Sequence, residues 1–280
     1  MIDFDGKVVL VTGGGAGIGR ATVAAFADLG ASVVALEVDP ERAEDLRSRL
    51  GNRALVVTGD ATVAPDVSAL AGTINERYGR LDVLVNNVGH FMTRPTPFER
   101  LTDGQIDDIY RVNLKHIFLV TRVMLPLLRA ADGNPSITNV SSIEGFRGIP
   151  RFAVYGAFKA AVTGFTMSLA LELGPEGIRV NAVAPETTDS AQVPLDRMIH
   201  ESQRHHIPRW IPLGRFGTPQ DIAGCVLFLA SPLAAWVSGT VLHADGGALA
   251  AAGWYRDDQG TWTNMPVIKG NSGKPAEAGG

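Results

Sequence analysis

Hydrophobic and polar positions follow two alternating periods along nearly the whole chain. Short β-branched runs are separated by longer stretches with the 3.6-residue spacing of amphipathic helices. The runs predict seven strands, at residues 7–12, 32–36, 54–58, 83–86, 136–139, 179–183 and 240–243. The longer stretches predict helices over residues 17–29, 40–50, 66–79, 102–130, 153–173 and 218–230. Because parallel strands need crossover connections, this alternation predicts a parallel sheet with helices on both faces.

The domain organisation follows from the same pattern. No linker rich in Pro, Gly or Ser divides the chain, so we predict a single α/β domain over residues 1–250, a doubly wound Rossmann-type sheet of about seven strands. Residues 186–217 interrupt the alternation, and a loop of this length in a compact domain is usually functional, so we predict a substrate loop there. Residues 251–280 form a C-terminal tail. Its first part contains the aromatic residues Trp254 and Trp262, whereas the part from Gly270 onward consists mostly of small and polar residues, and there we expect disorder.

Composition narrows the classes of partner. The net charge of -4 argues against nucleic acid and anionic membranes as partners. The single cysteine, Cys225, excludes an internal disulfide and a metal site built from cysteines. The first residues lack the basic and apolar segments of a secretory signal, and no apolar stretch approaches the roughly 20 residues that span a bilayer. We therefore expect a cytoplasmic protein.

Tyr155 and Lys159 are the strongest candidates for chemistry. They lie four residues apart in a predicted helix, so the phenol and the ammonium can share one face, and Ser142 lies thirteen residues upstream of Tyr155. A nearby cation lowers the pKa of a tyrosine and makes it usable as a general acid or base. Taken alone, the pair is also compatible with a surface contact of no function, and either Ser141 or Ser142 could cap a strand end.

A glycine-rich turn follows the first predicted strand and precedes a helix. It contains Gly13, Gly15, Gly17, Ile18 and Gly19, and such a turn lets the backbone approach a pyrophosphate at the helix N-terminus.

Glu37 ends the second strand, where a carboxylate can bind the hydroxyls of the adenosine ribose and repel the 2′-phosphate of NADP. We therefore predict NAD as the cofactor. The alternative is that Glu37 is a solvated strand end. For Asp39 we prefer the structural role of helix N-cap before Pro40.

Together these residues resemble the short-chain dehydrogenase/reductase family from about Gly6 to Gly247. The resemblance is carried by Thr12–Gly19, Asp60, Asn86–Gly89, Asn113, Ser142, Tyr155, Lys159, Pro212–Gly217 and Gly239–Gly247. It implies a catalytic tetrad of Asn113, Ser142, Tyr155 and Lys159. It also implies cofactor contacts from Gly13, Gly15, Gly17, Ile18, Gly19, Glu37, Asp60, Ala61, Asn87, Gly89, Tyr155, Lys159, Pro185, Thr188 and Ser190.

The resemblance implies hydride transfer between the nicotinamide C4 and a carbonyl or carbinol carbon. Tyr155 would exchange the proton, Lys159 would lower the pKa of Tyr155 and hold the nicotinamide ribose, and Ser142 would bind the substrate oxygen. Asn113 would hold a water that links Lys159 to solvent, although on its own it could simply bond a helix backbone. One departure is Glu186, which follows Pro185 where the family has glycine; we expect its side chain to face solvent, with a substrate contact as the alternative.

Apolar residues gather in the loops that should follow the carboxyl ends of the strands. They predict an apolar secondary alcohol or ketone as substrate, of steroid, terpenoid, aromatic or acyl type. The candidates for substrate contact are His90, Phe91, Glu144, Phe152 and Trp210. We expect Arg94, Arg147 and Arg151 to be solvated rim residues, or else to pair with an anionic part of the substrate.

Three further expectations concern metal, assembly and competing functions. The histidines, including the adjacent pair His205 and His206, lack metal-ligand spacing, so we predict no metal and solvated loop histidines. The resemblance implies a homotetramer packed through helices 102–130 and 153–173. The competing functions are a catalytically silent dinucleotide sensor or scaffold, and a sugar-nucleotide epimerase or dehydratase.

Overall fold

The computed structural model describes residues 2–190, 193–195, 199–257 and 260–263. Seven parallel strands form one sheet in the order β3-β2-β1-β4-β5-β6-β7. The strands are β1 (Val8–Thr12), β2 (Ser32–Glu37), β3 (Ala54–Thr58), β4 (Val83–Asn86), β5 (Ser136–Val140), β6 (Arg179–Pro185) and β7 (Val241–Ala244). The strand order reverses between β1 and β4, which is the switch point where such sheets bind ligands. The predicted doubly wound single domain is confirmed.

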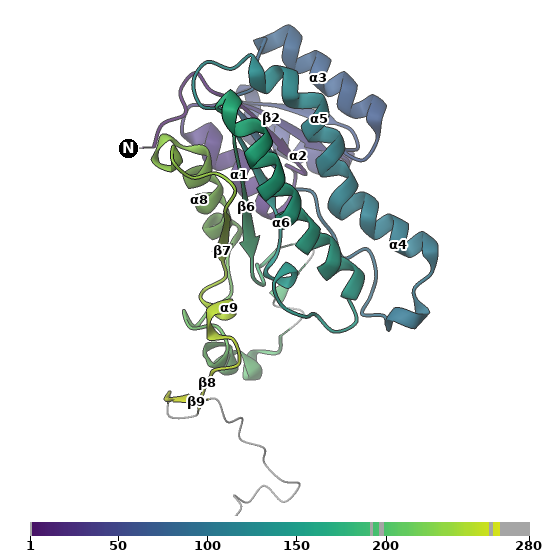
Figure 1. Cartoon of the computed structure of the whole chain (residues 1–280), viewed down its shortest axis with the longest axis vertical. Helices are drawn as coiled ribbons and strands as arrows, with labels where there is room; N and C mark the ends of the chain where they lie inside the picture. The colour runs from purple at the N-terminus through teal and green to yellow at the C-terminus, as the bar shows by residue number, and fades with distance from the viewer. Residues whose placement is uncertain (1, 191–192, 196–198, 258–259, 264–280) are drawn as a thin grey trace, which may run out of the picture.

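Helices cover both faces of the sheet, and Figure 1 shows how they surround the strands. They are α1 (Gly17–Asp28), α2 (Pro40–Leu50), α3 (Ala64–Tyr78), α4 (Asp103–Tyr110), α5 (His116–Arg129), α6 (Ala153–Leu173), α8 (Pro219–Ala230) and α9 (Ala248–Ala251). The predicted helix 102–130 exists as α4 and α5 joined by a π-helical turn, η3 (Arg111–Lys115).

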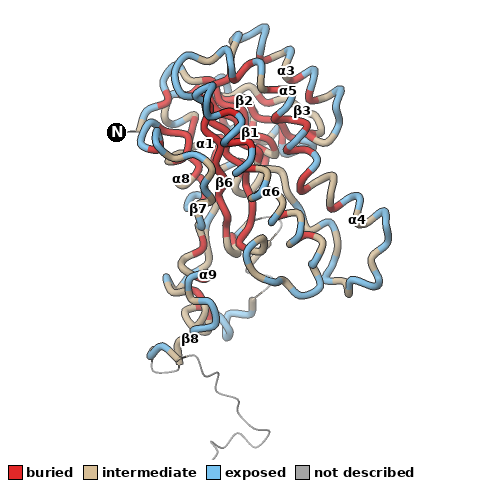
Figure 2. The backbone as a smooth tube through the Cα atoms, viewed as in Figure 1, coloured by how far each residue is buried: buried red, intermediate tan, exposed pale blue. Residues whose placement is uncertain are grey.

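The core consists of two layers because side chains alternate along each strand. In β1, Val8 and Leu10 face the side packed by α3, α5 and α6, whereas Val9 and Val11 face α1, α2 and α8. Figure 2 shows the buried residues concentrated along the strands. Strands buried on both faces read as continuous apolar runs, which explains why they were visible in the sequence.

From the sequence we predict that no apolar stretch is long enough to span a bilayer. Judged by length and composition alone, this prediction is wrong for one segment. Residues Ala153–Glu176, which contain α6, form a helical stretch long and apolar enough to cross a bilayer. The structure gives a different reason for its apolarity. Val162, Leu169 and Leu173 are buried where α6 packs against β6, although only 33% of the apolar window is buried in all.

The predicted substrate loop, residues 186–217, contains a 3-10 helix, η6 (Glu201–Arg209). Ile207 and Ile211 pack with Ile143 and Ala184, so this segment lies over the carboxyl ends of β5 and β6. The adjacent His205 and His206 lie in η6 rather than in a loop; His205 is exposed and His206 is half-buried.

The tail continues into a short hairpin, β8 (Tyr255–Arg256) and β9 (Trp262–Thr263), which lies far from the sheet (Figure 1). Its aromatic side chains stay about half-exposed, with Trp254 at 49% and Trp262 at 46%. The part predicted to be disordered, from Gly270 onward, lies outside the described residues.

Candidate active site

The glycine turn between β1 and α1 is packed too closely for any side chain at Gly19. A Cβ there would lie 2.0 Å from the Gly13 carbonyl oxygen and 2.6 Å from Asn87 Nδ2. Asn87 Nδ2 donates hydrogen bonds to the carbonyl oxygens of Thr12 (3.0 Å) and Gly13 (3.1 Å). Asn87 thus ties the end of β4 to the turn, and it holds the backbone of the turn in place at the switch point.

Glu37 is buried beside this turn, with 4% of its surface exposed. Its Oε2 accepts a hydrogen bond from the Gly15 N–H (2.8 Å), and its Oε1 accepts one from the Asp39 N–H (3.1 Å). A solvated strand end is therefore the wrong interpretation of Glu37. A carboxylate offers about four acceptor positions, so about two remain for the hydroxyls of a ribose.

Asp39 has the predicted structural role. Its side chain accepts hydrogen bonds from the N–H groups of Glu41 and Arg42 at the start of α2. The N-cap interpretation of Asp39 is confirmed.

The other cofactor candidates lie in the turns that follow the strands. Asp60 Oδ1 accepts from the Thr62 N–H (2.7 Å), so this carboxylate shapes the turn beside the buried Ala61. A Cβ on Gly17 would lie 3.2 Å from the Ser190 Cβ, so the segment after β6 comes back to the glycine turn. These turns together form a cradle of backbone and carboxylate groups that fits a dinucleotide; their individual roles stay predictions.

Gly89, Pro185 and Thr188 complete this region. A Cβ on Gly89 would lie 2.9 Å from Lys159 Nζ, so glycine leaves room for the lysine. Pro185 ends β6 and pairs with Ala244 in β7. Thr188 is 6% exposed, and its hydroxyl donates to the Glu186 carbonyl oxygen (2.9 Å).

Ser142, Tyr155 and Lys159 converge at the end of β5 and the start of α6, with 9%, 8% and 3% of their surfaces exposed. A hydrogen bond links the side chains of Ser142 and Tyr155. Lys159 Nζ lies 5.7 Å from the centre of the Tyr155 ring and donates to the Val140 carbonyl oxygen (3.1 Å). Ser141 is directed elsewhere, since its hydroxyl donates to the Lys159 carbonyl oxygen (2.9 Å). The structure thus favours Ser142 over Ser141 as the partner of Tyr155.

The pKa values of the pair differ from expectation. Burial raises the pKa of Tyr155 to about 12; the hydrogen bond from Ser142 lowers this pKa in part, and the charge of Glu144 raises it further. Burial also lowers the pKa of Lys159 to about 8. The Tyr155 pKa is therefore raised overall, not lowered, because desolvation of the phenolate and the charge of Glu144 together outweigh the hydrogen bond with Ser142; the effect of Lys159 on this pKa stays a prediction.

Asn113 lies fully buried in the π-helical turn η3. Its Nδ2 donates to the carbonyl oxygens of His90 (2.8 Å) and Ile109 (2.9 Å), and its Oδ1 accepts from the His90 N–H (3.1 Å). The extra residue of a π turn is often found at functional sites. Asn113 thus bonds a helix backbone, which was the alternative to a functional role, and it also holds the loop after β4 next to Lys159.

His116 is a buried residue of this region that the sequence patterns did not single out. It is fully buried at the start of α5, and burial together with the charge of Lys159 lowers its pKa to about 3, so the imidazole is neutral. The Val88 backbone opposes this lowering in part, but neither ring nitrogen makes a well-aligned hydrogen bond within the described part of the chain. Nothing in its spacing in the sequence distinguishes it from a surface residue of an amphipathic helix.

Aromatic side chains lie directly against Tyr155. The Phe91 ring lies 4.6 Å from the Tyr155 ring and 4.8 Å from the Phe152 ring. The neighbours of these phenylalanines, Met92 and Arg151, have positive φ angles of 60° and 66°, which are rare for residues other than glycine. Residues in this left-handed conformation are often found at functional sites, and here they flank the two phenylalanines beside Tyr155.

Two other substrate candidates lie nearby in different settings. His90 is exposed, and its Nδ1 accepts from the Met92 N–H (2.8 Å). Trp210 follows η6 and packs against the cluster of Ile143, Ile207 and Ile211 at the ends of β5 and β6. Both residues thus lie at the carboxyl-end face of the sheet, as predicted.

Arg147 and Glu186 contradict the expectation of a solvent-facing glutamate and a solvated arginine. The Glu186 side chain is 6% exposed, and its Oε2 accepts from Arg147 Nη2 at 2.7 Å. The same nitrogen also donates to Glu144 Oε1 at 2.8 Å. No spacing pattern predicts this pairing, because Arg147 and Glu186 are 39 residues apart along the chain.

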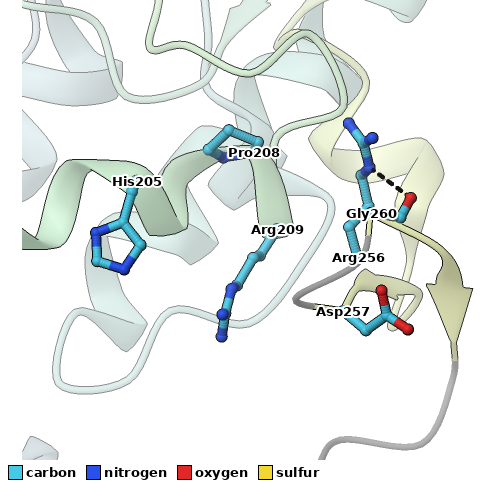
Figure 3. A pocket seen from close by; sticks show the side chains of 6 residues that line it. All are labelled: His205, Pro208, Arg209, Arg256, Asp257 and Gly260. Atoms are coloured by element: carbon cyan, nitrogen blue, oxygen red, sulfur yellow. Dashed lines mark hydrogen bonds between the residues drawn. The ribbon is translucent and has the colours of Figure 1, made fainter.

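Two cavities lie between the loop 186–217 and the tail. One, of about 340 Å³, is lined by His205, Pro208, Arg209, Arg256, Asp257 and Gly260 (Figure 3). The other, of about 410 Å³, is lined by Pro212, Gly247, Ala250, Ala251, Trp254 and Trp262. Neither lining includes a residue of the tetrad. Within the described ranges, no group of three or more His, Cys, Asp or Glu side chains is arranged to hold a metal ion.

Comparison with known proteins agrees with the geometry. The family model described as enoyl-(acyl carrier protein) reductase matches residues 13–248. The chain is 39% identical over 251 residues to the 3-oxoacyl-[acyl-carrier-protein] reductase of Thermotoga maritima, which covers 87% of this chain and 98% of that protein. It is 34% identical over 247 residues to the enzyme of the same name from Escherichia coli, with 88% and 98% covered.

Solved structures give the same result. A 3-ketoacyl-(acyl-carrier-protein) reductase from Brucella melitensis, complexed with NADH, matches with a TM-score of 0.80 and 34% identity over 88% of this chain and 99% of that one. Levodione reductase matches with a TM-score of 0.81 and 33% identity over 89% and 99%. With the glycine turn, the convergent Ser142, Tyr155 and Lys159, and these matches over most of its length, the chain belongs to the short-chain dehydrogenase/reductase family of oxidoreductases.

Proposed function

We propose that the protein is an NAD(H)-dependent oxidoreductase that interconverts a secondary alcohol and a ketone on an apolar substrate. The observation that carries the proposal is the buried contact of Ser142, Tyr155 and Lys159 beside the aromatic rings of Phe91 and Phe152. A phenol, a hydroxyl and an ammonium next to an apolar wall can bind a carbonyl oxygen and exchange a proton with it.

The choice of NAD rests on Glu37. Its buried carboxylate lies at the glycine turn, where it would accept hydrogen bonds from ribose hydroxyls and repel a 2′-phosphate. The Brucella melitensis neighbour is described as complexed with NADH, which supports the same choice. The groups of the cradle that would hold the dinucleotide are the glycine turn, Glu37, Asp60 and the segment Thr188–Ser190.

When bound, the nicotinamide supplies or accepts the hydride. Tyr155 donates its phenolic proton to the substrate oxygen in reduction and takes it back in oxidation. Ser142 donates a hydrogen bond to the same oxygen, where negative charge develops. Because the pKa of Tyr155 is raised to about 12, the phenol is protonated at neutral pH and is ready to act as an acid. Lys159 holds a positive charge below a pH of about 8, which favours transfer of the proton away from Tyr155.

The substrate class follows from the walls of the site. Phe91, Phe152 and Trp210 supply apolar surface, which suits a steroid, terpenoid, aromatic or acyl-type compound. Relatives named as 3-oxoacyl and 3-ketoacyl reductases support a ketone as the reducible group.

A panel assay tests the proposal. Hydroxysteroids, cyclic terpenoid alcohols, aromatic secondary alcohols and hydroxyacyl thioesters are each mixed with NAD, and NADH formation is followed by absorbance beside a Tyr155→Phe control. A signal that the control lacks supports the proposal and identifies the substrate class. NADH binding without turnover of any compound, in either direction, favours a catalytically silent sensor.

We further propose that the protein works in the cytoplasm as a homotetramer. Met167 and Leu171 are 51% and 83% exposed and lie four residues apart on one face of α6, which supports association through this helix.

A further inference from the structure

Arg147 joins two segments that are distant in the sequence. Glu144 and Arg147 belong to the turn after β5, which begins with Ser142, whereas Glu186 begins the segment after β6. Arg147 Nη2 contacts Glu186 Oε2 at 2.7 Å and Glu144 Oε1 at 2.8 Å, and Arg147 Nε contacts Glu144 Oε2 at 3.3 Å. One guanidinium therefore binds two carboxylates at the ends of two neighbouring strands.

This cluster is partly withdrawn from water. The side chains of Glu186, Glu144 and Arg147 are 6%, 16% and 34% exposed. A buried carboxylate is costly unless it is paired, and here both carboxylates depend on the same cation. The arrangement differs in this respect from Arg215 with Asp221, a contact of the same 2.7 Å length whose side chains are 58% and 39% exposed.

Each end of the cluster is connected to a group of the proposed mechanism. The Glu144 N–H donates to Ser142 Oγ at 3.2 Å, and Ser142 in turn is bonded to Tyr155. On the other side, the Glu186 carbonyl oxygen accepts from the Thr188 hydroxyl at 2.9 Å, and Thr188 lies in the segment that returns to the glycine turn. The cluster thus lies between the substrate-oxygen donor and the segment proposed to hold the cofactor.

Glu186 occupies the position where a glycine was expected from the family pattern. A glycine has no side chain with which to connect the end of β6 to the turn after β5. In this chain, the carboxylate provides that connection through Arg147.

We propose that Glu144, Arg147 and Glu186 form an electrostatic clamp that positions Ser142 and the Thr187–Ser190 segment relative to each other. This inference rests on the proposed function for its effect on turnover. Arg147 and Glu186 act as positioning residues, since they hold the groups around the substrate and the dinucleotide rather than the reacting atoms.

The test compares Arg147→Met, Glu186→Gln and the double variant with the wild-type protein. Each is measured for its melting temperature, its Kd for NADH by fluorescence titration, and its kcat and KM with a substrate found by the panel assay. Arg129→Met is the matched control, because it removes an equally short but exposed pair with Glu176 at 2.6 Å, away from the site.

Arg147→Met leaves two carboxylates without a cation, so we expect a lower melting temperature, at least a fivefold higher Kd for NADH and at least a tenfold lower kcat/KM. The double variant removes the more buried of these charges. Its melting temperature should recover toward that of the wild type, whereas NADH affinity and kcat/KM stay low because the connection is still missing. Arg129→Met should change the Kd for NADH and kcat/KM by less than twofold.

Two results would overturn the clamp. One is a folded Arg147→Met with NADH affinity and kcat/KM within twofold of the wild type. The other is a double variant in which both values recover together with the melting temperature, since the pair would then serve stability alone. Failure of the proposed function can be distinguished from failure of the clamp. If the wild-type protein shows no turnover, the effect of Arg147→Met on the Kd for NADH still tests the clamp.

Discussion

Replacing Glu37 with Gln should change the cofactor preference of the protein. The carboxylate is 4% exposed and already accepts hydrogen bonds from the N–H groups of Gly15 and Asp39. Gln has nearly the same shape and keeps one acceptor oxygen, so it retains part of this bonding. It removes the negative charge that would face a 2′-phosphate.

The size of the effect follows from Coulomb's law. Two unit charges about 5 Å apart at an effective dielectric constant of about 20 interact with about 3 kcal/mol. Since about 1.4 kcal/mol corresponds to a factor of ten, the wild-type protein should prefer NAD over NADP by about 100-fold or more in kcat/KM. Glu37→Gln should lose most of this preference, chiefly through better use of NADP.

The assay measures kcat/KM with NAD and with NADP at a fixed substrate concentration, and the Kd values for NADH and NADPH by fluorescence. Glu41→Gln is the control, because Glu41 is an exposed glutamate on the neighbouring helix α2. A ratio of NAD to NADP activity that is the same within twofold in Glu37→Gln and in the wild type would refute the role of this charge.

Three further predictions concern Lys159, Gly19 and Leu171. Lys159→Met should abolish turnover yet raise stability at pH 7 by up to about 3 kcal/mol, because folding lowers the lysine pKa from 10.5 to about 8. The wild type should correspondingly gain stability between pH about 8 and 10.5, because in this range the unfolded chain binds one more proton than the folded chain. Denaturant melts of the wild type and of Lys159→Met across this pH range check the stability difference and its pH dependence. Gly19→Ala should lose NADH binding because its Cβ would lie 2.0 Å from the Gly13 oxygen, whereas Gly72→Ala on α3, with open space around its Cβ, should bind NADH normally in the same titration. Leu171→Glu should reduce the assembly mass measured by light scattering, and a wild-type protein that already runs at 29.6 kDa would contradict the proposed tetramer.

The fold was predictable because local and global signals agree. Strands buried on both faces appear as apolar runs such as Val8–Val11, and capping residues such as Asp39 mark where helices begin. The π-helical turn at Asn113 could not be predicted from the spacing, since Asn113 exchanges two hydrogen bonds with the His90 backbone, which the tertiary structure brings close.

The site was predictable only in part, for a related reason. Tyr155 and Lys159 are neighbours on one helix, so their proximity follows from helical geometry. The contact of Arg147 with Glu186 joins residues from different crossover units, and no spacing rule reports such a pair. The raised pKa of Tyr155 could not be predicted either, because the degree of burial is a property of the folded chain and not of the spacing.

Tyr155→Phe tests the central claim most directly, since it removes one hydroxyl and keeps the ring that lies against Phe91. A general acid contributes about 10²–10⁴-fold to rate, so kcat/KM should fall by at least 100-fold while the Kd for NADH stays within threefold. Tyr78→Phe, outside the site, should change neither value. A Tyr155→Phe protein that keeps more than a third of wild-type kcat/KM would contradict the assignment of Tyr155 as the proton donor.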